Sequence, residues 1–443
     1  MSEASGPPPA DTPAPDTRAP GTPGLSRASL VAGSGLLVLG ISASVFLVVT
    51  ARMVGPVAFT GVAVLWTLVY TVGIGVFLPF EQELSRAASV RLARGEGAGA
   101  LLRLSALVAL GVLAALVVLV VAAMLVPAVR DPLLDGSWAY AAGLLVAVAG
   151  LGLQYLQRGS FSATGDFVGY GAQQGVEGVV RTVACLVLAA AGVDDPRAYV
   201  AVLALSPHVS VVALAGRLRR TTGTAGGPAH WHELRGRFGW LLVATLGSQA
   251  LANLAAPAVR VLSSPREVEA AGNFLSALTI ARIPLLLFAA VQAALLPRLV
   301  RAREAGDRRE FGQQLRVVLA ATAAVGLAGV LGVAVLGPWV LRLLFGPAFG
   351  LPRSDLVLLA LSAGVLMLGL ALQSAVVALD DHRGSALAWV AGVAVFLAVL
   401  VVPAPVLLRV ELALVVGSVA VVALLGTAVR RHLADLAVSG RRN

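Results

Sequence analysis

Long apolar runs are the feature that most constrains the fold of this chain. A run of about 20 residues is long enough to cross the roughly 30 Å hydrocarbon core of a bilayer as a helix. The runs are continuous, whereas strands of a membrane barrel alternate apolar and polar residues. The sequence therefore predicts an all-α integral membrane protein with twelve transmembrane helices, near residues 29–50, 58–80, 104–126, 138–157, 168–192, 198–216, 238–262, 269–296, 317–337, 355–379, 385–406 and 411–429.

Composition and charge agree with this prediction. Of the 443 residues, 58% are hydrophobic and 13% are charged, and the mean hydropathy of +0.89 lies outside the range of soluble domains. All 33 basic residues are arginine, and most fall in cytoplasmic connections if the amino terminus is inside. We expect a multi-pass protein of a bacterial cytoplasmic membrane with both termini in the cytoplasm. The net charge of +10 then reflects topology and attraction to anionic membrane lipids, not nucleic acid binding.

The sequence contains an internal repeat. Gly-Leu-Gly-Leu-Gln at 150–154 matches Gly-Leu-Ala-Leu-Gln at 369–373, and the Arg-rich stretch from Ser85 resembles the one from Pro297. Six spans separate the matching segments, so the two halves keep the same direction through the membrane. The repeat predicts two six-helix bundles related by a pseudo-two-fold axis along the membrane normal.

This repeat defines the expected domains. An amino-terminal six-helix bundle occupies residues 29–216 and a carboxy-terminal six-helix bundle occupies 238–430, with a cytoplasmic linker at 217–237. Residues 1–28 are rich in Pro, Ala, Ser, Thr and Gly, so we expect a disordered cytoplasmic tail. Residues 431–443 form a second cytoplasmic tail.

The connections between spans limit the possible functions. Two basic connections, 81–103 and 298–316, are predicted to be short amphipathic helices on the inner membrane surface. The predicted outer loops are short and leave no room for an outer catalytic domain. The sequence has no phosphate-binding loop, metal-ligand cluster or nucleophile motif. We therefore expect no enzyme activity and no cofactor, and leave open coupling to protons or sodium ions.

An arginine near the middle of the eighth predicted span is the leading site candidate. Arg282 lies where hydrocarbon imposes a cost of several kcal/mol on a charge. Pro284 removes a backbone donor, so we expect a kink beside this charge. A planar guanidinium suits phosphate oxygens, and we interpret Arg282 as an anion-binding residue in a broken helix. The alternative is a snorkelling or helix-paired arginine in a structural network.

The fifth predicted span carries two further charges. Glu177 and Arg181 lie four residues apart, and therefore on one helix face, about halfway across the membrane. We expect a neutral structural pair; the alternative is that Glu177 takes up a proton or cation when substrate competes for Arg181. Both are candidate substrate-binding residues. Arg158 and Asp166, at the cytoplasmic entry to this helix, are interpreted as solvated interface residues.

Three amides complete the candidate site. Gln249 and Asn253 lie in the seventh predicted span, where Pro257 frees the carbonyl of Asn253, and Asn273 lies in the eighth. Together with Arg260, near the outer end of the seventh span, they are candidates to line a polar cleft. Buried amides also link membrane helices, so a structural role is the alternative for each. Cys185, the only cysteine, is interpreted as a packing residue.

Several segments resemble the polysaccharide-exporter branch of the multidrug/oligosaccharidyl-lipid/polysaccharide (MOP) superfamily, to which the MATE transporters are related. The resemblance covers about residues 28–430. It implies two six-helix bundles around a central cavity that opens alternately to each leaflet, with lipid-linked oligosaccharide as the usual substrate class. By position, it implies that Arg282 and Arg181 supply a cationic cavity. The segments that carry it are Leu78–Arg86, Arg158–Asp166, Leu344–Phe349, and Ala281–Phe288 running into Gln292–Arg298.

The leading hypothesis is a flippase that moves a lipid-linked oligosaccharide or polysaccharide precursor across the cytoplasmic membrane by alternating access. Arg282 would hold the phosphate or pyrophosphate, and the three amides would contact sugar hydroxyls. The alternative is a MATE-like cation-coupled antiporter of drugs or small molecules, which should carry acidic residues facing the cavity, whereas the interior here is net basic. A non-transporting scaffold is a third hypothesis, and envelope glycosyltransferases are candidate partners.

Overall fold

The computed structural model describes residues 27–221, 226–264, 267–285, 288 and 299–439. Several predictions fall wholly or partly outside these residues: most of the tail 1–28, part of the linker, the later part of the eighth span with Gln292–Arg298, and the end of the second tail. Within the described residues every regular element is a helix. The all-helical fold class is therefore confirmed for this part of the chain.

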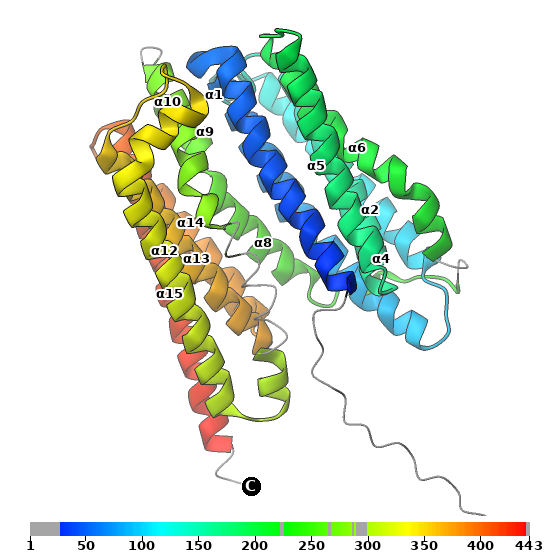
Figure 1. The fold of residues 1–443 in the computed structure, drawn as a ribbon. Coiled ribbons are helices and arrows are strands. Elements are labelled where there is room, and N and C mark those ends of the chain that lie inside the picture. The colour runs from blue at the N-terminus through cyan, green and yellow to red at the C-terminus, as the bar shows by residue number, and fades with distance from the viewer. Residues whose placement is uncertain (1–26, 222–225, 265–266, 286–287, 289–298, 440–443) are drawn as a thin grey trace, which may run out of the picture.

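The first helices run as a closely packed group (Figure 1). The longest, α1, contacts α4 and α5, and α4 also packs on α6. The bounds are α1 Arg27–Ala93, α2 Gly99–Met124, α3 Pro127–Leu134, α4 Trp138–Ala163, α5 Phe167–Ala190 and α6 Pro196–Thr221.

A second group follows the linker and forms the other side of the view in Figure 1. Here α13 packs on α12 and α15, and α14 packs on α15 and α8. The bounds are α7 Trp231–Leu234, α8 Phe238–Asn253, α9 Ala255–Leu262, α10 Val268–Ala281, α12 Arg308–Phe345, α13 Arg353–Ala378, α14 His382–Val399 and α15 Val406–Ser439.

The described helices support a multi-pass membrane protein. Eight of them are long and apolar enough to cross a membrane, or nine if the bent pair α8 and α9 forms one span. Ten of the twelve apolar segments predicted from the sequence overlap these helices or the bent pair. The fifth segment and the described part of the eighth correspond to α5 and α10, which are not among the candidate spans. Twelve spans in two bundles remain a prediction.

Helix α1 contains the first two predicted spans. Gly55 has a left-handed backbone (φ 76°) in the middle of it, a conformation that costs glycine little. The rings of Phe46 and Trp66 stack with centroids 5.3 Å apart, although 20 residues of straight helix would separate them by about 30 Å. The two arms of α1 therefore fold back on each other at Gly55.

Two helices are interrupted beside predicted site residues. Helices α8 and α9 meet at Leu254 with a bend of 52°, directly after Asn253. Helix α10 ends at Ala281, and the amide of Leu285 donates to the carbonyl of Arg282 at 3.0 Å. The interruption predicted near Pro284 is therefore present, and it places Arg282 at a helix end.

The first of the two predicted inner-surface helices is not a separate element. Residues 81–93 continue α1 instead, because Leu84, Ala87 and Ala88 are buried against the rest of the molecule. The second stretch, 298–316, is divided by Gly306, whose left-handed backbone (φ 68°) separates the helical residues 299–304 from α12. The first prediction was wrong because apolar residues of 81–93 pack on protein. Residue 298 lies outside the described residues, and a surface position of the second stretch stays a prediction.

The turns that lead into α5 and α14 have the same construction. Asp166 accepts from the amide of Gly169 at 2.9 Å and pairs with Arg217 on α6. Asp381 accepts from the amide of Gly384 at 2.7 Å and contacts His432 on α15. In both turns the aspartate and its basic partner are 51 residues apart. This correspondence is what the sequence repeat predicts for these parts of the halves.

The two groups are joined at the end predicted to face outward. Arg52 of α1 donates from Nε to the carbonyl of Leu344 at 2.6 Å, and its guanidinium also donates to the carbonyl of Leu343. Phe59 of α1 packs against Phe345 and Phe349, with ring centroids 6.2 and 6.3 Å away. The segment Leu344–Phe349, noted above for its resemblance, thus closes this contact.

Candidate substrate site

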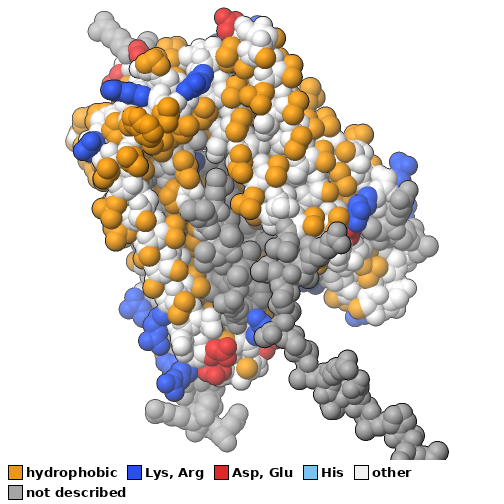
Figure 2. All heavy atoms as spheres, in the orientation of Figure 1, with side chains coloured by type: hydrophobic (Ala, Val, Ile, Leu, Met, Phe, Trp, Pro, Cys, Tyr) orange, Lys and Arg blue, Asp and Glu red, His pale blue; other side chains and the backbone are white. Residues whose placement is uncertain are grey.

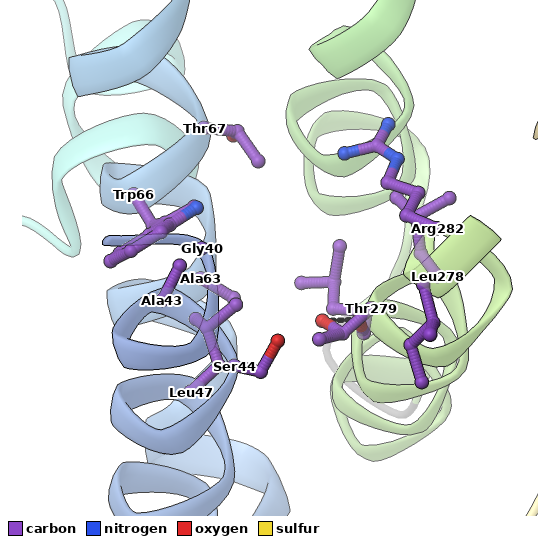
Figure 3. A pocket seen from close by; sticks show the side chains of 12 residues that line it. Gly40, Ala43, Ser44, Leu47, Ala63, Trp66, Thr67, Leu278, Thr279 and Arg282 are labelled. Atoms are coloured by element: carbon purple, nitrogen blue, oxygen red, sulfur yellow. Dashed lines mark hydrogen bonds between the residues drawn. The ribbon is translucent and has the colours of Figure 1, made fainter. Parts of the chain in front are cut away.

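A small cavity lies between the two groups of helices, with Arg282 on its wall (Figure 3). Its volume is about 140 Å³, enough for about four water molecules. One wall is α1, which contributes Ser44, Trp66 and Thr67; the other is the end of α10, with Thr279 and Arg282. The back-folding of α1 at Gly55 explains why residues from both of its arms share this wall.

Arg282 is the only charged residue that lines this cavity among the described residues. Its Nη1 donates to Asn253 Oδ1 at 3.2 Å, and it forms no ion pair with a described carboxylate. A guanidinium offers five N–H donors, so one amide oxygen leaves most of its capacity unused. The arrangement provides an uncompensated positive charge on the wall of a small cavity.

Three of the predicted site residues form a row. Arg282 contacts Asn253, and Asn253 Nδ2 donates to Gln249 Oε1 at 3.3 Å. Asn253 is the last residue of α8 before the bend, so the break in one helix meets the break in the other. Gln249 and Asn253 do not line the cavity themselves. Asn253 contacts Arg282 directly, and Gln249 contacts Asn253.

Asn273 is not brought to this row. It lies nine residues before Arg282 on α10, and at 3.6 residues per turn two such positions point to opposite sides of a helix. Its Oδ1 is buried without a hydrogen-bond partner among the described residues. Its neighbour Gly272 packs directly on the Pro56 carbonyl of α1, so this part of α10 forms a close helix contact.

Glu177 and Arg181 form the expected ion pair. Their side chains are 2% and 1% exposed, and Arg181 also donates to the hydroxyl of Tyr70 at 2.6 Å. Gln154 Nε2 donates to the second Glu177 oxygen at 2.9 Å and to the hydroxyl of Ser210 at 2.7 Å. A buried pair with such added hydrogen bonds is largely neutralised. Arg181 therefore lacks the free charge that Arg282 has.

Trp66 links this network to the cavity. Its ring lines the cavity, and the guanidinium of Arg181 lies 5.4 Å from the ring centroid. The Tyr70 ring, whose hydroxyl accepts from Arg181, lies 4.5 Å from the Trp66 ring. Trp66 therefore contacts both the cavity and the side chains of the buried ion-pair network.

A second buried network joins two of the segments that resemble the polysaccharide exporters. Arg158 Nε donates to Glu81 Oε2 at 3.1 Å, and Tyr170 donates to the other Glu81 oxygen at 3.0 Å. The guanidinium of Arg158 lies 4.1 Å from the centroid of the Tyr155 ring. The interpretation of Arg158 as solvated was wrong, because its partner lies on α1, 77 residues away in the sequence.

Sequence reasoning missed the α1 side of the site. Trp66 and Thr67 lie in an apolar span, where an aromatic and a hydroxyl are ordinary residues. The spacing of Trp66 and Tyr70 by four residues places both on one helix face, and this was the available signal. The interpretation of Asp166 as merely solvated also missed its role as the helix cap of α5. Cys185 is buried, as a packing residue should be.

Comparison with curated proteins gives distant relatives. The chain matches no protein-family model. It is 26% identical over 403 residues to the uncharacterized protein Rv3630 of Mycobacterium tuberculosis, covering 85% of this chain and 87% of that protein. It is 27% identical over 319 residues to the uncharacterized protein Rv1510 of the same organism, covering 70% and 68%.

Comparison with solved structures identifies the fold. An inward-facing multidrug resistance MATE transporter of the MOP superfamily matches 93% of this chain and 96% of its own with a TM-score of 0.66 and 16% identity. An outward-facing form of such a transporter matches with a TM-score of 0.63 and 14% identity over the same shares. The bent form of Vibrio cholerae VcmN matches 91% and 98% with a TM-score of 0.57 and 15% identity. The chain therefore has the fold of the MATE transporters.

Proposed function

We propose that this protein is a membrane transporter that moves a lipid-linked oligosaccharide or polysaccharide precursor across the membrane by alternating access. The observation that carries the proposal is Arg282, an unpaired cation on the wall of a cavity between the two groups of helices. The MATE fold supports transport, because the solved proteins with this fold are described as transporters in inward-facing and outward-facing conformations.

The charge of the cavity favours an anionic substrate. Arg282 has one amide contact, and no described carboxylate lines the cavity. A charge kept in a membrane interior without a partner is costly unless a ligand compensates it. A phosphate or diphosphate group fits this role because guanidinium binds phosphate oxygens through paired hydrogen bonds.

The small volume of the cavity favours a substrate of which only the phosphate group binds inside it. A volume of about 140 Å³ lies below the roughly 300–1,000 Å³ of sites that enclose drug-sized ligands. The phosphate would bind at Arg282 while the prenyl chain stays in lipid. The glycan would then pass when α1 and α10 move apart, with Asn253, Gln249 and Asn273 as candidate contacts for its hydroxyls.

The proposal includes the finer architecture expected from the sequence. Twelve helices would form two six-helix bundles, at 29–216 and 238–430, with both termini in the cytoplasm. The Asp166 and Asp381 turns support the repeat, because each aspartate contacts a basic residue 51 positions later in the sequence. Arg181 and Glu177 would respond to substrate through Trp66, and envelope glycosyltransferases are the expected partners.

A MATE-like antiporter of drugs or small molecules is the second candidate. The fold supports it as well as it supports the flippase. Glu177 would then be the coupling residue, taking up a proton or sodium ion when Arg181 releases it. Dye efflux that is driven by an ion gradient and lost in Glu177→Gln, at normal protein abundance, would favour this candidate.

A binding measurement tests the flippase proposal. Purified protein in nanodiscs is titrated with a fluorescent polyprenyl diphosphate disaccharide and with the matching neutral polyprenyl alcohol. We expect the diphosphate to bind at least about tenfold more tightly, because charged hydrogen bonds contribute about 1.5–3 kcal/mol. Arg282→Gln should abolish this preference. Arg260→Gln should retain it, because Arg260 pairs with Asp135 and does not line the cavity. An unchanged preference in Arg282→Gln would show that the anion binds elsewhere.

A further inference from the structure

A second hollow lies between α12 and α15. It is a groove of about 780 Å³ that shares no lining residue with the cavity. Helices α12 and α15 both pack on α13, which places Leu372 at the bottom of the groove. The size is that of a site for a small molecule.

Two glycines make this groove hollow. Gly312 of α12 and Gly426 of α15 line it, and a Cβ added to either would meet no other heavy atom within 4 Å. Glycine inside a helix costs about 1 kcal/mol relative to alanine. In most helix contacts close packing explains such a glycine, but here neither glycine faces a neighbour among the described residues. The space that they leave is open to a ligand.

Two arginines hold matching positions over these glycines. Arg316 Nε donates to the carbonyl of Gly312 at 3.2 Å, and Arg430 Nε donates to the carbonyl of Gly426 at 3.4 Å. In each case the glycine lies four residues earlier in the helix. These bonds hold each guanidinium against the groove and leave its terminal N–H groups for an acceptor.

The charge of the groove is positive at one end. Arg308 and Arg309 also line it, and none of the four arginines forms an ion pair with a described carboxylate. Figure 2 shows basic side chains along the lower end of the helices on the left, below a broad apolar surface. Deeper in the groove the lining is apolar, with Leu319 on α12 and Val422 on α15.

We infer that this groove binds one anionic phospholipid of the inner leaflet. Its phosphate would lie between Arg316 and Arg430, and an acyl chain would extend along Leu319, Leu372 and Val422. The match is one of charge and polarity: basic pockets between membrane helices on the cytoplasmic side bind anionic headgroups. The inference is independent of the transported substrate.

Native mass spectrometry tests this inference. Purified protein is equilibrated with equimolar phosphatidylglycerol and phosphatidylcholine that carry the same acyl chains. We expect wild type to retain one phosphatidylglycerol with at least tenfold preference. The variant Arg316→Gln/Arg430→Gln should lose this preference, whereas Arg94→Gln/Arg103→Gln, which removes two arginines outside the groove, should keep it.

A groove-filling variant separates the site from general attraction to lipid. Gly312→Leu/Gly426→Leu keeps all arginines and places side chains in open space. Because it also removes two helical glycines, it should fold with an equal or higher melting temperature and lose the bound lipid. Retention of the lipid by this variant would overturn the inference. Equal retention of the two lipids by wild type, displacement by glycerol phosphate alone, or tighter retention of a polyprenyl phosphate would also overturn it.

Discussion

At the scale of residues, two arginines of predicted membrane spans differ in their partners. Arg181 has Glu177 and Tyr70, whereas Arg282 has only the amide of Asn253 among the described residues. Removing one member of a buried ion pair leaves the other charge uncompensated, and this costs about 3–5 kcal/mol. Removing a charge that has no ionic partner in a membrane span also removes the free-energy cost of keeping it there. The two arginines should therefore respond in opposite ways to the same substitution.

The first prediction follows from this difference. Arg181→Gln should lower the free energy of unfolding by about 3–5 kcal/mol, and Arg282→Gln should leave it equal or higher. Thermal unfolding in one detergent measures both. The double variant Glu177→Gln/Arg181→Gln is the control and should recover much of the loss. Equal destabilisation by Arg181→Gln and Arg282→Gln would mean that Arg282 is a structural residue.

The second prediction concerns the acid sensitivity of the α5 cap. The Arg217 guanidinium holds the pKa of the Asp166 carboxyl below its ordinary value of 3.8. A lowered folded-state pKa contributes stability above the unfolded pKa, and this contribution is lost as the pH falls through the folded value. Asp166→Asn keeps a capping oxygen and removes the ion pair.

Because Arg217 is 45% exposed, the pair should contribute at most about 1 kcal/mol at pH 7. We expect Asp166→Asn to melt slightly below wild type at pH 7 and to differ less from it near pH 3. Melting curves at both pH values measure this difference. A difference that is undiminished or larger at pH 3 would contradict the assignment.

Particular residues show how far the sequence predicts the site. Arg282, Asn253 and Gln249 were predicted and lie in one row, because a buried charge and Pro-flanked amides are visible locally. Trp66 was not predicted as a site residue, because an aromatic residue in an apolar span does not by itself indicate a binding site. The Arg158 interpretation failed for a related reason: its partner Glu81 lies on another helix. Pairing across distant segments is set by the fold.

At the scale of elements, helix positions follow from apolar length, whereas proline predicts only some of the breaks, because Pro207 and Pro338 lie inside continuous helices. Pro257 and Pro284 lie beside the two interruptions at the site. The back-folding of α1 at Gly55 was expected only as a short loop. Extension of α1 through residues 81–93 was not predicted, because it depends on burial against neighbouring helices. Local sequence therefore predicts where the helices lie, and packing against other helices determines where they end.

The third prediction concerns the Arg52 contact at the predicted outer end. Hydrogen bonds from a charged donor contribute about 1.5–3 kcal/mol. Loss of the two bonds in Arg52→Ala should favour separation of the groups and raise access to the cavity from outside by about tenfold or more. The reporter is Ala63→Cys, which lies on the cavity wall, in a Cys185→Ala background.

Labelling with an impermeant maleimide from the outer face measures this access. Arg130→Ala is the matched control, because Arg130 lies at the same predicted end and pairs only with its neighbour Asp131 among the described carboxylates. Its labelling rate should equal that of the parent. An unchanged rate in Arg52→Ala would show that the Arg52 contact does not hold the two groups together.

At the scale of the whole molecule, Arg282 and the segments that resemble the polysaccharide exporters lie at different places in the fold. Leu78–Arg86 and Arg158–Asp166 meet in the Glu81–Arg158 pair within the first group. Leu344–Phe349 joins the groups at one end, and Arg282 lies in the cavity between them. Such an arrangement, with a charged site between two groups of helices, suits a protein that exposes the site alternately to the two sides of a membrane.

The most direct test of the flippase hypothesis is the leaflet distribution of lipid-linked glycan. Cells are depleted of the protein, and oriented vesicles are labelled with a probe that cannot cross the membrane. We expect lipid-linked glycan to accumulate on the cytoplasmic leaflet, with rescue by wild type but not by Arg282→Ala at normal abundance. An unchanged distribution on depletion, or full rescue by both Arg282→Ala and Arg282→Lys, would contradict the assignment of Arg282 as the anion site of a flippase.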